Sequence, residues 1–493
     1  MSDTLEKTLH QISPRYLKPN TPFPSIIIHS GVALLWFILL LNACWGKGLM
    51  AWIIGLVYIG YDTALLLFTF RQTCRLRIKQ PSATRQQPRP SLTVIIAAFN
   101  EASVLKSAIN AIQNQSEPPE TLIIADDGST DATDFILADD FKILTPQLNE
   151  ISPPGHLRWL RAQRGGKSRT LNRVIPHVTT ELTVTVDADT ILAPNALAAM
   201  RDGFSENPNL VAATGVLSPF CDKSVRGRVF EWFQTYEYIR NFLGRYAWSR
   251  MKSLVLISGA FAGFRQQALL TVGGFDSDCL VEDYELVHRL LRYSYLHDLN
   301  WETDVIGGAL ARTSAPCNVG GFLKQRRRWF AGFLQTHYWY RDMVGARQFK
   351  NLGLWMLPIK AIDTFQPVFG LSAFLFLIWY ALTGQLTIVI PVIVIIALKI
   401  LVDLSFHLWS VKIYKDWTGS QRRYSFFRII CASIIEPFSF QLLRHLGACW
   451  GWLTVFSGKQ SWNSQRRIAF TDNRIDAAQK RIPLKRRGGC DRD

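Results

Sequence analysis

The hydrophobic positions along the chain form two long, nearly uncharged regions on either side of a central region with a mixed pattern. The first region contains residues 25–45, which have no formal charge, and residues 49–70, which have a single acid, Asp62. Each run is long enough to cross a bilayer, because a transmembrane helix needs about 20 apolar residues. The pattern predicts a transmembrane helical hairpin over residues 25–70, after an N-terminal tail of residues 1–24.

The second apolar region covers about residues 352–456. Its clearest predicted spans are residues 367–382 and 385–407. Residues 426–456 are interrupted by charged residues and a proline, so a bent span, a hairpin and a re-entrant segment all remain open. We assign residues 345–457 to interfacial and transmembrane helices.

Ionisable residues inside these spans usually face a cavity or a partner. Lys399 and Asp403 stand four residues apart, on one face of a predicted helix. They could form an intrahelical ion pair, or they could line a passage for a hydrophilic molecule, and the pattern does not separate the two. Asp62 is expected near the membrane interface.

Between the two apolar regions, residues 91–344 show the pattern of an α/β domain. Residues 92–98 and 121–125 are β-branched runs typical of buried parallel strands, and a helical pattern between them ends near Asn114. Strand, helix and strand of this length form a βαβ unit, whose ligands bind at the carboxyl ends of the strands. A third strand is predicted at residues 182–186.

The charge distribution orients these regions. The chain of 493 residues has 55 Lys and Arg against 38 Asp and Glu, a net charge of +17. A basic linker, residues 71–90, and a basic tail, residues 458–493, flank the apolar regions, and such flanks mark the cytoplasmic side of a bilayer. We therefore expect a multi-pass protein of the plasma (inner) membrane with a cytoplasmic central domain and an even number of C-terminal crossings, two or four. This topology accounts for the positive charge, so nucleic-acid binding is not expected.

Two acidic motifs follow predicted strands of the central domain. Asp126-Asp127-Gly128-Ser129 could bind ribose hydroxyls or the uracil imide, or it could be an Asx turn that caps the next helix. In Asp187-Ala188-Asp189 both carboxylates would point the same way on an extended backbone and could share a divalent cation. Two other Asp-x-Asp triplets occur in the chain, but only this one ends a hydrophobic strand. Gly165-Gly166-Lys167 and Asn172 offer amides and a cation to a phosphate.

Further candidate motifs lie in the second half of the domain. Glycine-rich segments at 258–264 and 273–275 precede Val281-Glu282-Asp283, whose acids could accept a proton. Gln325-Arg326-Arg327-Arg328-Trp329 could hold a phosphate and stack on a sugar ring, although three arginines alone are more often a basic membrane-surface patch. Residues 225–251 are rich in aromatic residues and arginine, typical of an amphipathic helix on the core or on the membrane surface.

Taken together and in order, these motifs resemble the processive, membrane-embedded family 2 glycosyltransferases, which include cellulose, hyaluronan and poly-N-acetylglucosamine synthases. Each motif is weak on its own, whereas the ordered set is specific. The set consists of Ala98-Phe99-Asn100-Glu101, Asp126-Asp127-Gly128-Ser129, Gly166-Lys167, Asp187-x-Asp189, Gly273-Gly274-Phe275, Glu282-Asp283 and Gln325-x-x-Arg328-Trp329.

The resemblance implies a Rossmann-like α/β GT-A glycosyltransferase domain inserted between transmembrane α-helices, with a UDP-sugar as the donor. By motif matching, Asp127 would hold the uridine, with Lys167 close to the nucleotide. Asp187 and Asp189 would lie at a Mg²⁺ or Mn²⁺ ion on the diphosphate, with Asp189 as the direct ligand, and Arg328 would contact the diphosphate.

On the acceptor side, the resemblance implies that Asp283 is the general base for the acceptor hydroxyl. Gln325 and Trp329 would bind the acceptor, with Trp329 stacked beneath a sugar at the mouth of a translocation channel. One departure from the family pattern is Val281, which replaces the usual threonine and removes a hydroxyl near the base.

The resulting hypothesis is a processive, metal-dependent inverting glycosyltransferase that polymerises a β-linked polysaccharide and passes it across the membrane. The tail of fewer than 40 residues is too short for a cyclic-di-GMP-binding domain, so poly-N-acetylglucosamine synthases are the nearer match in size. The alternative is a membrane glycosyltransferase that adds one or a few sugars to a lipid. A transport or scaffold protein with an inactive transferase domain is disfavoured, because the acidic motifs are intact. Expected partners are the UDP-sugar donor, a growing glycan or lipid acceptor, membrane lipids and accessory membrane subunits.

Overall fold

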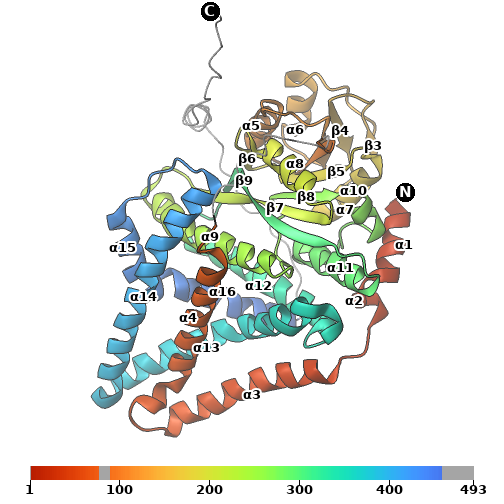
Figure 1. Cartoon of the computed structure of the whole chain (residues 1–493). Helices are drawn as coiled ribbons and strands as arrows, with labels where there is room; N and C mark the ends of the chain where they lie inside the picture. The colour runs from red at the N-terminus through yellow and green to blue at the C-terminus, as the bar shows by residue number, and fades with distance from the viewer. Residues whose placement is uncertain (1, 77–88, 458–493) are drawn as a thin grey trace, which may run out of the picture.

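The computed structural model of the protein describes residues 2–76 and 89–457. Figure 1 shows a β-sheet at the upper end, long helices at the lower end and a layer of helices between them. The predicted basic linker is covered only at its two ends, and the predicted basic tail, residues 458–493, lies outside the described residues.

A nine-stranded mixed sheet forms the centre of the upper end, with the order β3-β4-β2-β1-β5-β8-β7-β9-β6. Strand β1 pairs in parallel with β2 and β5, and β2 pairs in parallel with β4. The predicted βαβ unit and the α/β fold class are therefore confirmed. The strands are β1 (Leu92–Ala98), β2 (Thr121–Asp126), β3 (Glu150–Ile151), β4 (Leu157–Arg161), β5 (Leu182–Asp187), β6 (Thr190–Leu192), β7 (Leu210–Phe220), β8 (Phe261–Arg265) and β9 (Glu302–Ser314).

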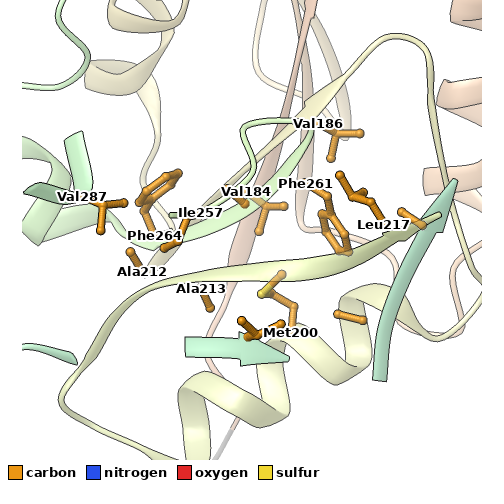
Figure 2. Close-up of a cluster of buried hydrophobic side chains, with 14 of the residues drawn as sticks. Val184, Val186, Met200, Ala212, Ala213, Leu217, Ile257, Phe261, Phe264 and Val287 are labelled. Atoms are coloured by element: carbon orange, nitrogen blue, oxygen red, sulfur yellow. The ribbon is translucent and has the colours of Figure 1, made fainter. Parts of the chain in front are cut away.

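Helices cover the sheet and bury its apolar side chains. Figure 2 shows one such cluster, in which Met200 of a helix faces Ala213 of β7 and Phe261 of β8. Met200 and Phe261 are fully buried where this helix packs against the sheet. The helices of the domain are α5 (Ala102–Gln113), α6 (Thr133–Phe135), α7 (Lys167–Val174), α8 (Ala196–Glu206), α9 (Val225–Arg250), α10 (Gln266–Thr271), α11 (Glu282–Leu296) and α12 (Val319–Trp339).

Four helical segments of the described chain are long and apolar enough to cross a membrane. Two of them include α3 (Phe23–Trp45) and α4 (Ile53–Thr73), which cover the predicted hairpin. The other two include α13 (Leu357–Leu382) and α14 (Leu386–Thr418), which cover the two predicted C-terminal spans. The chain is therefore a membrane protein by the length and composition of its helices.

Residues 426–456, for which the sequence left three forms open, fold as α15 (Phe426–Ile435) and α16 (Phe440–Phe456). The turn η7 (Glu436–Phe438) separates them, and the two helices are bent by 41°. The break falls at Pro437, which cannot donate a backbone hydrogen bond. This angle is far from the reversal of a hairpin, so the pair is a broken span or a re-entrant segment, and would be a fifth span if counted as one.

The ionisable residues in the membrane helices form one cluster. Lys399 of α14 contacts Asp403 one turn away and also Asp62 of α4, at 2.7 Å from its Nζ to Oδ2. Asp62 is thus paired with Lys399 of a neighbouring helix. The three residues line a cavity of about 100 Å³ between α4, α13, α14 and α16. The ion pair is therefore present, and the rest of the cavity lining is mainly apolar.

The middle layer joins the domain to these helices. Helix α16 packs along α12 at very short range: a Cβ on Gly451 would lie 2.7 Å from the carbonyl oxygen of Arg327. No helix was predicted before residue 25, but residues there form α1 (Ser2–Ile12) and α2 (Pro14–Leu17). Leu5 and Leu9 of α1 are buried against the domain, and Arg15 contacts Asp276 at 2.8 Å.

Candidate active site

Asp126 and Asp127 lie at the carboxyl edge of the sheet, where β2 ends. The carboxylate of Asp126 accepts a hydrogen bond from the amide of Ser129 at 3.0 Å, which is the Asx turn considered above. Gly128 closes the turn with a φ of +73°, and a Cβ there would lie 2.9 Å from the amide nitrogen of Arg164. Both the backbone conformation and this close approach require glycine.

The carboxylate of Asp127, which is 4% exposed, holds the loop that precedes α7. Its Oδ1 accepts hydrogen bonds from the amides of Gly165 at 2.8 Å and Gly166 at 3.0 Å, and from the hydroxyl of Thr170 at 2.8 Å. The two glycine amides were expected to serve a phosphate. They are bonded to Asp127 instead, because its carboxylate lies against the N-terminus of α7.

Two more polar groups border this loop. The guanidinium of Arg164 lies 3.7 Å from Asp127 and 3.1 Å from the centre of the Phe99 ring. Asn172, the other expected phosphate ligand, has its side chain bonded to the backbone of Phe275, at 2.8 Å to the amide and 2.7 Å to the carbonyl. Asn172 therefore fixes a neighbouring loop.

Lys167 begins α7 and reaches across the sheet edge to two acids. Its Nζ lies 2.6 Å from Asp187 of β5 and 3.6 Å from Glu282 of α11. Burial disfavours the charged amine, but the carboxylates of Asp187 and Glu282 outweigh it and raise the pKa of Lys167 above its ordinary value. The carboxylates of a strand and a helix thus meet at the ammonium group of Lys167.

Asp187 and Asp189 were expected to point the same way from one extended strand, but they do not lie on the same strand. Strand β5 ends at Asp187, and Asp189 lies in a turn before β6. Asp187 is partly exposed toward Lys167, whereas Asp189 is 2% exposed and lies 3.5 Å from the hydroxyl of Thr313. No group of three or more His, Cys, Asp or Glu side chains that could hold a metal occurs in residues 2–76 and 89–457.

Asp283 and Glu282 form the first turn of α11, where the helix dipole favours negative charge. The amide of Gly259 donates to Oδ2 of Asp283 at 2.6 Å, and the amide of Tyr284 donates to Oδ1 at 2.9 Å. The carboxylate is therefore held at a fixed angle. Burial, reinforced by the charge of Asp283, raises the pKa of Glu282, while Lys167 opposes the rise.

Helix α12 carries the predicted acceptor-binding residues to this position. Gln325 is buried, and its Oε1 has no hydrogen-bond partner among the described residues. Trp329 is only partly buried, and Arg328 is exposed. Burial raises the pKa of Glu282, and the positive charge of Arg328 is among those that oppose the rise.

Val281, where the resembled family has threonine, packs against α12. A Cβ on Gly332 would lie 2.4 Å from a methyl group of Val281. The amide of Leu280 donates to the side chain of Gln335 at 3.1 Å. The segment that carries the candidate base is therefore docked directly on the helix that carries Trp329.

Several residues of this site make contacts that were not predicted from the sequence. Glu282 was considered only as a possible proton acceptor beside Asp283, yet it lies 3.6 Å from Lys167. The amide of Gly259 lies in a glycine-rich motif that was noted without a function. Thr170 had no signal at all, because a single threonine on a helix is not distinctive.

Comparison with known proteins gives the class of this site. A sequence model of the family described as "Glycosyltransferase like family 2" matches residues 88–332, which include every candidate site residue described above. This match, together with the mixed sheet, indicates an inverting glycosyltransferase with a GT-A fold. It belongs to the family 2 glycosyltransferases and is similar to the poly-N-acetylglucosamine synthase group.

Among curated relatives, the poly-beta-1,6-N-acetyl-D-glucosamine synthase of Staphylococcus epidermidis is 27% identical over 331 residues, covering 66% of this chain and 71% of that protein. The synthase of the same name from Staphylococcus aureus (strain COL) is 24% identical over 318 residues, covering 63% and 68%. A solved mannosyltransferase, PcManGT from Pyrobaculum calidifontis in complex with GDP-Man and Mn²⁺, superposes with a TM-score of 0.52 at 20% identity, over 82% of this chain and 99% of that one. The similarity to the mannosyltransferase shows a shared fold and nothing more specific.

Proposed function

We propose that the protein is a processive glycosyltransferase that builds a β-linked polysaccharide from a UDP-sugar, in the manner of poly-N-acetylglucosamine synthases, and passes the product across the membrane. The observation that supports this most strongly is the meeting of three elements at one sheet edge. Lys167 of α7 contacts Asp187 of β5 and Glu282 of α11, and α12 with Trp329 is docked on Val281 beside them.

The residues divide the reaction between a donor side and an acceptor side. Lys167 and Arg328 would offset the negative charge that develops on the departing diphosphate. Asp283 would take the proton of the acceptor hydroxyl while that oxygen forms its bond to the anomeric carbon and the bond to the diphosphate oxygen breaks. Two backbone amides hold the Asp283 carboxylate, so its direction is set before the acceptor binds.

Acceptor binding is proposed for Gln325 and Trp329. A buried amide oxygen without a partner is costly, and a sugar hydroxyl could donate to Oε1 of Gln325. The partly exposed indole of Trp329 offers a flat apolar face for a sugar ring. Asp127 would contribute to uridine binding mainly by holding the loop next to Arg164 and Phe99.

The carboxylate oxygens of the site are of the chemical type that binds a divalent cation. Asp187 and Asp189 would hold a Mg²⁺ or Mn²⁺ ion, and carboxylates already converge on a cation at Lys167. Two protein carboxylates completed by substrate phosphates are the usual arrangement for Mg²⁺ with nucleotides. When bound, the ion would neutralise charge on the diphosphate leaving group.

The basic segments of the sequence support a catalytic domain on the cytoplasmic side, and the product would leave between the membrane helices. The cavity around Lys399 gives a polar position inside the bundle. A second cavity of about 450 Å³ between α3, α4 and α13 is lined mainly by apolar side chains. This second cavity favours the alternative function, transfer of one or a few sugars to a lipid, because an acyl or prenyl chain would fit an apolar site.

Radiolabel transfer tests the proposal. Membranes containing the protein would receive Mg²⁺ or Mn²⁺ and each common UDP-sugar separately, with products sorted by size and by organic extraction. We expect a high-molecular-weight product from one donor and none from the Asp283→Asn variant, which should still bind UDP. Label confined to the lipid extract would establish the alternative, and retained turnover in Asp283→Asn would remove Asp283 as the base.

A further inference from the structure

The arginine run before Trp329 is not a uniform basic patch. Arg328 is exposed, Arg327 lies 4.7 Å from the centre of the Trp450 ring, and Arg326 is 2% exposed. An arginine buried to this degree is expensive unless it is paired. Arg326 is paired with Glu237 of α9, at 2.8 Å between Nη2 and Oε2, and Glu237 is buried too.

The guanidinium of Arg326 lies between two aromatic rings of its own helix. Its central carbon is 4.3 Å from the centre of the Trp329 ring and 4.5 Å from that of Phe322. Residues three and four apart share a helix face, so this stacking follows from the spacing. One face of the indole is therefore covered by a cation whose position Glu237 sets.

The position of Glu237 is fixed from a third helix. Arg444 of α16 lies 3.7 Å from its Oε1 and 2.9 Å from Glu436. A Cβ on Gly447 of α16 would lie 2.6 Å from Cβ of Arg326, so this helix leaves the arginine little room to move.

We propose that Glu237 is a positioning residue for sugar binding: through Arg326 it holds the indole of Trp329 in one orientation, so that its other face is presented to the acceptor saccharide. This inference rests on the proposed role of Trp329 as a stacking platform. A ring fixed before binding loses less conformational freedom when the sugar arrives. The same contacts tie the acceptor platform to α16.

Footprinting tests the positioning without any substrate. The full chain in detergent would be oxidised with hydroxyl radicals, and mass spectrometry would follow the peptide that contains Trp329. We expect Glu237→Gln to raise the oxidation rate of Trp329 roughly threefold, because the ring loses its fixed stacking partner. The matched control is Glu231→Gln on the same helix, the same chemical change at an acid that pairs with Arg422 and Arg312 and not with Arg326 or Arg444. Equal rates in the wild type and Glu237→Gln, or the same rise in Glu231→Gln, would overturn the inference.

Kinetics with UDP-N-acetylglucosamine and a β-1,6-linked N-acetylglucosamine oligosaccharide test the consequence. Glu237→Gln should raise the acceptor KM roughly tenfold and leave the donor KM unchanged, and it should add less than about twofold in a Trp329→Ala background. Fully multiplicative effects would overturn the inference. An unchanged acceptor KM in Trp329→Ala would instead refute the proposed role of Trp329, while footprinting still decides the positioning.

A buried acid that loses its charge leaves Arg326 unpaired, so Glu237→Gln could fail to fold. The double variant Glu237→Leu/Arg326→Met removes both charges, and such replacements of buried pairs are often neutral for stability. It should show the same rise in Trp329 oxidation. An oxidation rate equal to that of the wild type would contradict the proposal.

Discussion

At the scale of single residues, the site is organised around opposite charges that lie close together. Lys167 faces Asp187 and Glu282, and Asp283 follows immediately in the chain. Burial raises the pKa of Glu282, and the charges of Lys167 and Arg328 oppose the rise. A diphosphate would add negative charge to these acids, and a divalent cation would offset it, which gives the first prediction.

Asp189→Ala should weaken UDP binding in the presence of Mg²⁺ or Mn²⁺ by about tenfold or more. The reason is that Asp189 would hold the ion, and the attraction between the ion and the diphosphate is strong in a site with little water. UDP binding without metal should change little. Isothermal titration with and without chelator measures both affinities, and Asp139→Ala, an exposed acid outside the site, serves as the control. The coordination scheme fails if the variant keeps the metal dependence of the wild type.

The chemistry of these residues could be predicted only where it is local in sequence. The Asx turn at Asp126 follows from spacing, since an aspartate and the amide three residues later are always near one another in a turn. The bonds from Asp127 to Gly165 and Gly166 span almost 40 residues, and no periodicity carries that information. For this reason, the expectation that the amides of Gly165 and Gly166 would bind a phosphate did not foresee their bonds to Asp127.

At the scale of elements, the N-terminal helices form a strap on the domain. Leu5 and Leu9 of α1 lie against the turn of Gly273 and Gly274, and Arg15 binds Asp276 beyond it. Asn172 of α7 holds the same loop from the other side. The strap thus braces the loop that leads from α10 toward Asp283.

Gly273→Ala should release this strap. Gly273 has a φ of +84°, and a Cβ there would lie 2.5 Å from the amide nitrogen of Leu9. We expect a loss of about 1–3 kcal/mol in the free energy of unfolding, together with faster proteolysis of α1. Thermal unfolding and limited proteolysis measure the two effects.

Gly244→Ala is the matched control for this change. Gly244 lies inside α9, and a Cβ there would have no neighbour within 4 Å. Alanine favours a helix over glycine, so this variant should be as stable as the wild type or slightly more so. Equal proteolysis of α1 in the two variants would show that Gly273 does not hold the strap.

The strands and long helices were predicted well because each of them is a continuous run of apolar residues. The three predicted parallel strands match β1, β2 and β5 within one residue, since buried parallel strands are continuous apolar runs. The N-terminal helices were missed, because α1 has only two buried leucines and its partner lies in a distant part of the chain. The bend between α15 and α16 could be located at Pro437 but its angle could not be read.

At the scale of the whole molecule, stability should depend on pH through buried histidines. His288 of α11 is fully buried, its Nδ1 donates to the carbonyl of Tyr284, and burial lowers its pKa to about 4. His337 of α12 lies near it, and burial lowers that pKa to about 3, while Lys360 of α13 disfavours a further charge. Both imidazoles are therefore neutral in the folded protein.

Whether stability rises or falls with pH follows from which state, folded or unfolded, binds more protons. Near pH 7 neither state binds a proton at His288. Below about pH 6.5 the unfolded chain binds one and the folded protein does not, so stability falls until about pH 4, by up to about 3 kcal/mol for this residue. The unfolding temperature should decline less between pH 7 and pH 5 in His288→Asn than in the wild type. An identical decline would assign the pH dependence to other groups.

The strap also sets an order of assembly during synthesis. Arg15 and Asp276 are 261 residues apart in the chain, and at 5–20 residues per second the ribosome needs roughly 15–50 s to cover that distance. Helices α3 and α4 emerge in this interval and can enter the bilayer, while the apolar face of α1 still lacks its binding surface. Docking of α1 therefore has to wait until residues 273–276 have been made. The contacts that join the N-terminal membrane hairpin to the C-terminal helices form later still, since Tyr58 and His445 are 387 residues apart.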